Sequence, residues 1–153
     1  MKKYYIAYGS NLNVHQMKFR CPDATIAGTA VITGYRLMFK GSLTGSYLTI
    51  EQAKGYKVPV GVWEVSEQDE INLDRYEGYP NFYYKADAEL MVRDAKTGNL
   101  TKRNCFIYIM HEYRKLGIPS RSYMDICFQG YKDFGFKKEY LVDAYKYSIG
   151  DKK

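Results

Sequence analysis

The first stretch whose residue types could do chemistry is Tyr8-Gly9-Ser10-Asn11-Leu12. It ends a run of strand-forming residues at 3–8, and a pattern typical of a helix follows at once. Where a strand enters a helix through small residues, several backbone N–H groups lose their ladder partners and point the same way, so they can receive an anion or an oxyanion. The alternative is a tight turn with a helix cap, which is a common use of these residues.

Glu77 is the second candidate, because it lies in the last turn of a predicted helix, immediately before Gly78. A carboxylate there meets the unfavourable negative end of the helix dipole. Aromatic residues at 76, 79, 82 and 84 would also exclude water, and both effects raise a carboxyl pKa towards the value that a general base or acid needs at neutral pH. Position alone leaves an ordinary exposed glutamate open as the alternative.

Standard catalytic motifs are missing from the sequence. It contains neither the P-loop motif G-x-x-x-x-G-K-[ST] nor the dinucleotide-binding motif G-x-G-x-x-G. The stretch GSLTG at 41–45 has leucine where a hydrolase nucleophile elbow needs serine. His111-Glu112 begins like the helix of a zinc protease, which needs a second histidine four residues on, but that residue is Lys115. His15 is the one other histidine in the sequence, so we expect no catalytic metal and no cofactor. A hydrolase with Ser10 as nucleophile and His15 as base is a weaker alternative, since it lacks a third orienting group.

The elements that must position these residues can be placed from their periodicity. Strands are expected at 3–8, 25–41, 46–53 and 58–66, and a hairpin at 82–94 and 101–110. Helices are expected at 14–21, with Asn11 or Asn13 as N-cap, from a capping box at Ser66 to Gly78, from Pro119-Ser120 to Phe134, and over 139–148. This order predicts one domain, residues 1–153, of class α+β, in which a few short helices flank a curled, mostly antiparallel, mixed β-barrel-like sheet.

Composition and charge narrow the class of partner. The formal net charge is +6, but lysines and arginines are scattered among acids, so we expect no nucleic-acid partner. The start, MKKYYIAY, has an apolar run too short for a signal peptide or a membrane span, which predicts no membrane association and a cytoplasmic protein. Cys21, Cys105 and Cys127 are far apart and odd in number, which agrees with a reducing compartment. The oligomeric state is open, a homodimer included.

Together these stretches resemble the γ-glutamylcyclotransferase-like family, which includes the γ-glutamylamine cyclotransferases and AIG2-like proteins. The similarity spans nearly the whole chain: IAYGSNL at 6–12 is similar to the family's binding loop, GVWEVSEQDEINLDRYEGYPNFYY at 61–84 to its strand, helix and catalytic-glutamate segment, and PSRSYMDICFQGYKDFGFKKEYL at 119–141 to its C-terminal helix.

The resemblance implies a fold, a reaction and a set of site residues. The fold would be that of the family, and the reaction would be cyclisation of a small γ-glutamyl substrate, releasing 5-oxoproline without a cofactor. Glu77 would accept and return the proton. The residues implied to contact the substrate are Tyr8, Gly9, Ser10, Asn11, Leu12, Asn13, Tyr84 and Tyr123, although Tyr83 competes with Tyr84 for the pocket position. Selection of the leaving group is expected in the segment 40–57. A non-catalytic module that binds a small carboxylate is the alternative function.

Overall fold

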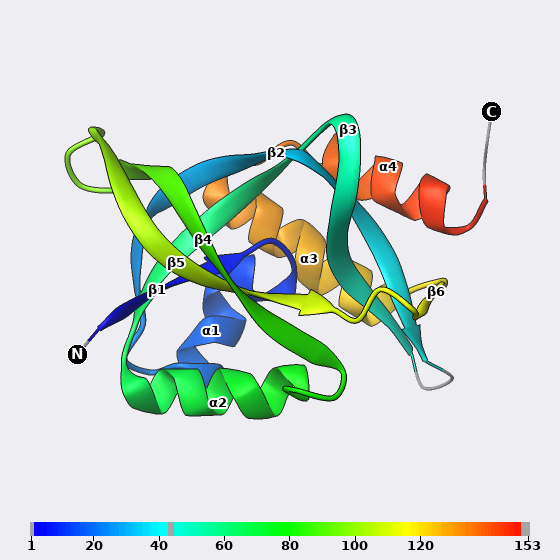
Figure 1. Cartoon of the computed structure of the whole chain (residues 1–153), viewed down its shortest axis with the longest axis horizontal. Coiled ribbons are helices and arrows are strands. Elements are labelled where there is room, and N and C mark those ends of the chain that lie inside the picture. The colour runs from blue at the N-terminus through cyan, green and yellow to red at the C-terminus, as the bar shows by residue number, and fades with distance from the viewer. Residues whose placement is uncertain (1, 43–44, 151–153) are drawn as a thin grey trace.

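The computed structural model describes residues 2–42 and 45–150. Within these ranges a six-stranded sheet has the order β3-β1-β5-β4-β2-β6. The strands are β1 (Lys3–Ala7), β2 (Thr25–Ser42), β3 (Gly45–Val65), β4 (Tyr83–Asp94), β5 (Leu100–Met110) and β6 (Lys115–Leu116). Because β3 also pairs with β2, five strands close into a barrel and β6 lies outside the ring (Figure 1). The β1–β5 pair is parallel and the other pairs are antiparallel.

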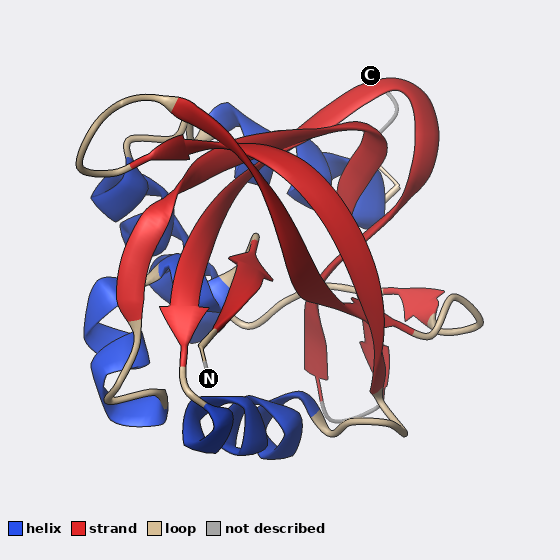
Figure 2. Ribbon diagram, turned by 60° about the vertical axis from the view of Figure 1, so that its left-hand side comes forward, coloured by secondary structure: helices blue, strands red, loops and turns tan. Residues whose placement is uncertain are grey.

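Two long strands make closure of the barrel possible. Strands β2 and β3 run antiparallel along most of their length, and their register shifts at two places, next to Gly28 and next to Gly34. The backbone φ of Gly34 is +79°, a value that suits glycine at a bulge. At Gly28 an added Cβ would lie 2.0 Å from the carbonyl oxygen of Arg93, so glycine allows β2 and β4 to approach. The bent strands are visible in Figure 2, where the sheet curls over itself.

The helices connect the strands and cover the barrel from outside. A short 3-10 helix, η1 (Ser10–Leu12), leads into α1 (Val14–Arg20), and α2 (Glu67–Glu77) crosses beneath β4 in Figure 1. The chain ends in α3 (Arg121–Phe134) and α4 (Glu139–Ser148). In α3, Cys127 and Tyr131 are fully buried, which fits the apolar stripe of its sequence. None of the helices in the described ranges is long and apolar enough to cross a membrane.

The predicted fold class is confirmed, as are the hairpin, the capping box at Ser66 and the N-cap at Asn13. The two strands predicted at 46–53 and 58–66 are one continuous strand, β3, because the chain between them keeps strand conformation through the irregularity opposite Gly34. Strand β6 was not predicted. Its two residues pair with Lys40 and Gly41 of β2, and such a short stretch carries no detectable alternation.

Candidate active site

The loop after β1 exposes a row of backbone donors. Strand β1 ends at Ala7, and the N–H groups of Leu12 and Asn13 bond back to the carbonyl oxygens of Gly9 and Ser10 at 3.0 Å. The N–H groups of Gly9, Ser10 and Asn11 form no hydrogen bond with any of the described residues. Three consecutive free donors at a strand end are the arrangement that favours a negatively charged or polarised oxygen.

Surrounding side chains hold this loop by its acceptors. Trp63 donates its indole N–H to the Asn11 carbonyl at 2.9 Å, and the Tyr131 hydroxyl donates to the Tyr8 carbonyl at 2.9 Å. The Asn11 side chain donates to the Tyr5 hydroxyl and accepts from Arg20 at 2.7 Å. The carbonyls and side chains of the loop are therefore occupied, while the N–H groups remain for a ligand.

Glu77 is positioned by both ends of α2. The side chain of Ser66 accepts from the Asp69 backbone and the Asp69 side chain accepts from the Ser66 backbone, which completes the predicted capping box. The helix ends immediately after Glu77 because Gly78 adopts the left-handed conformation, with φ +62°. This stop leaves Glu77 at the junction between α2 and the approach to β4.

The carboxyl group of Glu77 is enclosed by protein although the residue as a whole keeps some solvent contact. Burial raises its pKa from 4.5 to about 8, and the positive charge of Arg20 partly opposes this shift. The Glu77 carboxylate has no ion pair or hydrogen bond with any described residue. It therefore titrates close to neutral pH, as a general base or acid requires.

Glu77 and the loop line the same hollow. An inner cavity of about 20 Å³, the size of a single water site, is lined by the loop, Glu77 and surrounding side chains, namely Tyr5, Ile6, Tyr8, Gly9, Ser10, Asn11, Leu48, Glu77, Tyr83, Tyr108 and Tyr123. It adjoins an outer cavity of about 200 Å³ with Ser10, Tyr47, Tyr76, Glu77, Phe82, Tyr83 and Tyr123 on its walls. Ser10, Glu77, Tyr83 and Tyr123 belong to both, so the two cavities form one small polar pocket.

Two tyrosines fix the far wall of this pocket. The Tyr83 hydroxyl donates to the Leu48 carbonyl at 2.7 Å, and the Leu48 N–H donates to the Tyr123 hydroxyl at 3.1 Å. Burial raises the pKa of both phenols well above 10, so they stay neutral. Both hydroxyls are therefore held at fixed positions on β3, facing the loop and Glu77.

The structure departs from the expected site at three positions. Tyr84 points away from the pocket because adjacent strand residues alternate, and Tyr83 takes the place expected of it. Tyr84 instead lines a separate cavity, where its hydroxyl bonds to Glu112. Leu12 is fully buried in the core, and Asn13 caps α1 and bonds to the Ile126 carbonyl, so both support the loop from behind.

Arg20 is a site residue that the sequence reasoning missed. Its guanidinium stacks 3.7 Å from the centre of the Tyr76 ring and bonds to Asn11 and Gln16. It thus ties α1 to the loop and contributes the positive charge that acts on Glu77. A single basic residue at the end of a short helix carries no sequence signal beyond favourable interaction with the helix dipole.

The predicted rivals to this site are not assembled. Ser10 bonds to the Tyr76 hydroxyl at 3.1 Å, while His15 is exposed and packs on Phe19, so they form no dyad. Among the described residues no cluster of three or more His, Cys, Asp or Glu side chains has the geometry to hold a metal ion. Burial raises the pKa of Cys21 and Cys127 to about 12, which keeps both thiols protonated.

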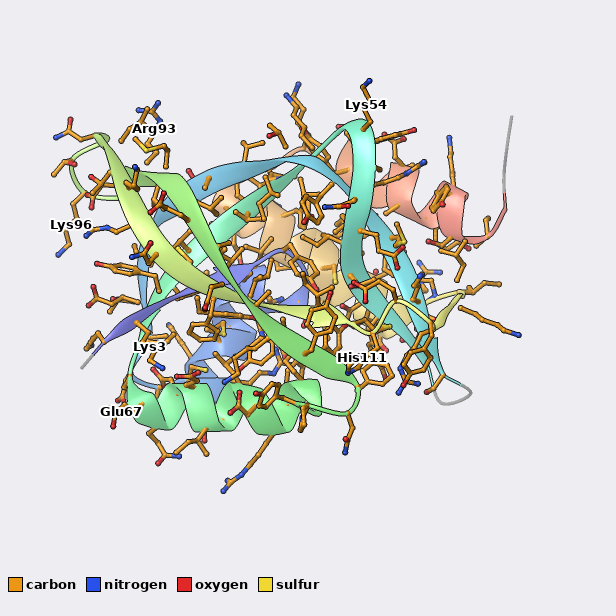
Figure 3. The ribbon with its side chains drawn as sticks, in the orientation of Figure 1. Lys3, Lys54, Glu67, Arg93, Lys96 and His111 are labelled. Atoms are coloured by element: carbon orange, nitrogen blue, oxygen red, sulfur yellow. The ribbon has the colours of Figure 1, made fainter. Side chains whose placement is uncertain are left out.

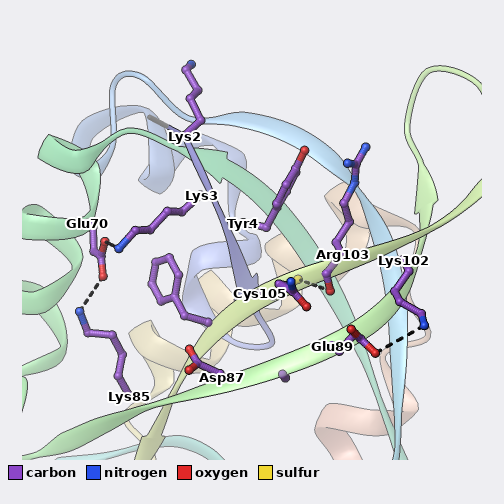
Figure 4. A pocket seen from close by; sticks show the side chains of 13 residues that line it. Lys2, Lys3, Tyr4, Glu70, Lys85, Asp87, Glu89, Lys102, Arg103 and Cys105 are labelled. Atoms are coloured by element: carbon purple, nitrogen blue, oxygen red, sulfur yellow. Dashed lines mark hydrogen bonds and ion pairs between the residues drawn. The ribbon is translucent and has the colours of Figure 1, made fainter.

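A larger surface hollow, about 970 Å³, lies elsewhere, over β1, β4 and β5 (Figure 4). Some of its charges are paired: Glu70 bonds to Lys3 at 2.9 Å and to Lys85 at 2.7 Å. Other basic side chains are dispersed, as Figure 3 shows for Lys54 and Lys96 at separate edges of the molecule. The pocket at Glu77 is smaller, but it alone combines a carboxyl group of raised pKa with free backbone donors among the described residues.

The structure is thus an α+β barrel whose pocket contains one enclosed glutamate and a loop of backbone N–H groups. Residues 5–125 match the family model described as "Gamma-glutamyl cyclotransferase, AIG2-like", and the chain belongs to this family. It is 32% identical over 143 residues to a human protein named "Gamma-glutamylcyclotransferase" and 28% identical over 144 residues to the mouse protein of that name; each match covers 89% of this chain and 73% of the relative.

A solved structure named "Gamma-glutamyl cyclotransferase" has the same fold. It superposes with a TM-score of 0.79 at 26% sequence identity, over 94% of this chain and 86% of the other. The predicted family and its fold are thereby confirmed.

Proposed function

We propose that the protein is a γ-glutamyl cyclotransferase that converts a small γ-glutamyl substrate into 5-oxoproline and a free amine or amino acid. The observation that carries the proposal is the shared pocket, in which the Glu77 carboxyl faces a loop with three free N–H groups. Family membership supports the same reaction class, and the human and mouse relatives bear its name. The pocket suits a small polar molecule better than a macromolecule, and dispersed surface charge gives no support for a nucleic-acid partner.

The first step requires a base. The substrate's α-amine is mostly protonated at neutral pH and cannot attack a carbonyl in that form. Glu77, with its raised pKa of about 8, is poised to exchange a proton with such an ammonium group. The positive charge of the incoming ammonium favours ionised Glu77, which then takes one proton and leaves the amine lone pair free.

Ring closure follows from the freed amine. Its nitrogen attacks the γ-carbonyl carbon, forming the C–N bond of the five-membered ring and placing negative charge on the carbonyl oxygen. The N–H groups of Gly9, Ser10 and Asn11 are assigned to this oxygen, and one such donor is typically worth about 3 kcal/mol of transition-state stabilisation. Because the reacting groups belong to one molecule, the protein's task is orientation and proton handling.

Collapse of the tetrahedral intermediate completes the reaction. Glu77 returns its proton to the leaving nitrogen as the bond from the γ-carbon breaks, and it then takes the second proton of the ring nitrogen, which leaves a neutral lactam. The released amine accepts this proton, which regenerates ionised Glu77. The hydroxyls of Tyr83 and Tyr123, fixed against β3, shape the wall along which the glutamyl chain folds. Atoms and charge balance without an added group.

The test is release of 5-oxoproline from a panel of γ-glutamyl amino acids and γ-glutamyl amines, measured for the wild type and for Glu77→Gln. Glutamine keeps the shape of the side chain and removes the base. We expect release by the wild type and a fall of at least about 100-fold in the variant, the range of general acid–base catalysis. If no substrate reacts, stabilisation of the fold by glutamate or 5-oxoproline would instead identify a binding module.

A further inference from the structure

Three acidic side chains lie on one stripe of α2. Glu70, Asp74 and Glu77 are spaced i, i+4 and i+7, which places them on the same face of the helix. The proposed reaction uses Glu77 alone. Like charges three or four residues apart on a helix destabilise one another, and here the effect falls on a carboxyl group that is already enclosed. The two other carboxylates therefore need compensation.

Lysines from the barrel compensate the first two carboxylates. Lys85 of β4 lies 2.7 Å from Glu70 and 2.9 Å from Asp74, so it bridges two consecutive turns of α2. Lys3 of β1 lies 2.9 Å from Glu70, and Figure 4 shows Lys3, Glu70 and Lys85 side by side. These four residues form a charge row in which two acids and two lysines cancel. Among the described residues, Glu77 is the acid of this stripe without a cation in contact.

Tyr108 of β5 joins the charge row to the binding loop. Its hydroxyl donates to the Asp74 carboxylate at 2.5 Å, at the oxygen that also pairs with Lys85. Its backbone carbonyl accepts from the Tyr8 hydroxyl at 2.7 Å, and Tyr8 leads directly into the loop. Tyr108 thus contacts both the helix that carries Glu77 and the start of the loop, and it lines the inner cavity that these two share.

The distance along α2 decides which charges of the row act on Glu77. At about 1.5 Å per residue, Asp74 precedes Glu77 by about 4.5 Å along the helix axis and Glu70 precedes it by about 10.5 Å. Salt screens exposed charges separated by more than about 8 Å at physiological ionic strength. Asp74 therefore acts on Glu77 far more strongly than Glu70 does. Lys85, in contact with Asp74, opposes that action.

The other titratable groups that interact with Glu77 add one charge among the described residues. They are six phenols and one guanidinium, namely Tyr5, Tyr8, Tyr76, Tyr83, Tyr108, Tyr123 and Arg20. Burial raises the pKa of every one of these phenols above its ordinary value, so they stay neutral while Glu77 titrates. Arg20 and the ion pair of Asp74 with Lys85 are then the charges that act on Glu77.

We propose that Asp74, Lys85 and Tyr108 are positioning residues for Glu77, which fix its helix turn against the binding loop and hold the net charge beside it at zero. This rests on the proposed function. Tyr108 keeps the last turn of α2 at a set distance from the loop, so that the base and the N–H donors act on the same substrate. Lys85 compensates Asp74, which leaves burial and Arg20 to set the pKa of Glu77.

Charge variants test the compensation through changes of opposite sign. Asp74→Asn keeps the shape and leaves the cation of Lys85, so the pKa of Glu77 should fall, whereas Lys85→Gln leaves the anion of Asp74, so it should rise. We expect each midpoint to move by about 0.5–1 pH unit, and the double variant to return to the wild-type midpoint. NMR titration of glutamate labelled at the carboxyl carbon, assigned with Glu77→Gln, measures the midpoint without a substrate.

The matched control is Lys3→Gln, which removes an equal charge from the far end of the charge row. Its titration midpoint should equal that of the wild type, because Lys3 pairs with the acid that lies two helical turns from Glu77.

Tyr108→Phe tests the positioning, since it keeps the ring and removes the hydrogen bond to Asp74. The kcat for 5-oxoproline release should fall by about tenfold with little change in KM, the effect of losing one hydrogen bond to a charged group. The N–H groups of Gly78 and Tyr79, which bond to the Asp74 carbonyl, should also exchange with solvent about tenfold faster, because the last turn of α2 loses its anchor.

Midpoints that stay in place, or move in the same direction in both single charge variants, would refute the compensation. Unchanged kcat and unchanged hydrogen exchange in Tyr108→Phe would refute the positioning. Failure of the proposed function gives a different result, since the wild type would then release no 5-oxoproline from the panel. Opposite midpoint shifts and faster exchange without such release would support the arrangement around Glu77 and refute cyclisation.

Discussion

Replacement of Glu77 by glutamine should stabilise the protein relative to the wild type, by an amount that grows with pH, although it removes the proposed base. An unfolded glutamate has a pKa of about 4.3, whereas burial raises the pKa of Glu77 to about 8 in the folded chain. Between these values the folded protein binds more protons than the unfolded chain, so this group lowers the unfolding free energy as the pH increases. The contribution of protonated Glu77 to stability is fully present below the pKa of the unfolded chain. It is lost as the pH rises through the pKa of the folded protein.

The size of the effect follows from the difference between the two pKa values. At about 1.4 kcal/mol per pH unit, the raised pKa of Glu77 lowers the unfolding free energy by up to about 3.5 kcal/mol at pH 7 and about 5 kcal/mol at pH 9. Water in the pocket reduces both figures, because it solvates part of the carboxylate. Glutamine cannot ionise, so the stability gap between variant and wild type should widen from pH 5 to pH 8 and level off towards pH 9.

Urea unfolding followed by the fluorescence of Trp63, the single and buried tryptophan, measures this gap at each pH. Subtraction of the wild-type curve from the variant curve cancels the other titrating groups. Glu67→Gln, at the exposed opposite end of α2, is the matched control, and its curve should run parallel to that of the wild type. A Glu77→Gln curve that is also parallel from pH 5 to pH 9 would refute the assignment of a buried, destabilising carboxylate.

Three further predictions concern activity. The kcat/KM of the wild type should rise with pH around pH 8, as Glu77 ionises. Arg20→Gln should move this rise to higher pH, because the positive charge of Arg20 lowers the pKa of Glu77, and an unchanged pH profile would contradict that electrostatic link. Ser10→Ala should reduce cyclisation by about tenfold or less, since it removes one neutral hydrogen bond to Tyr76, whereas complete loss would favour a serine nucleophile. Gly130→Ala should destabilise the protein by about 1–3 kcal/mol and lower activity, because the new Cβ would lie 2.7 Å from the Asn13 nitrogen. A gain in stability, which is the usual result of this substitution in a helix, would refute the prediction, and Gln129→Ala is the control.

The sequence predicted those parts of the fold that local patterns determine. The Ser66 capping box and Gly78 marked both ends of α2. Glu77 could be selected because its position before a helix-ending glycine is visible in the sequence. Closure of the barrel was expected only in outline, since the β1–β5 pairing joins segments about 100 residues apart and leaves no local signal.

Side-chain direction was harder to predict than position along the chain. Tyr83 and Tyr84 are adjacent and chemically equal, so choosing between them required the register of β4, which a shift of one residue inverts. Arg20 gave no signal in the sequence, because it lies in no motif. Its place in the site depends on the ring of Tyr76, which another segment brings to it. Cations whose partners are aromatic faces therefore need the tertiary structure.

The pocket combines features that individually weaken a fold. Glu77 is enclosed without a counter-ion in contact, and the loop keeps three N–H groups free. The chain maintains them because the surrounding frame is strongly determined: Tyr131 and Trp63 fix the loop, and the closed barrel fixes β3. A substrate with an ammonium and a γ-carbonyl would satisfy both groups together. Ligand binding should therefore stabilise the fold through complementary charges at sites that the empty protein leaves unsatisfied.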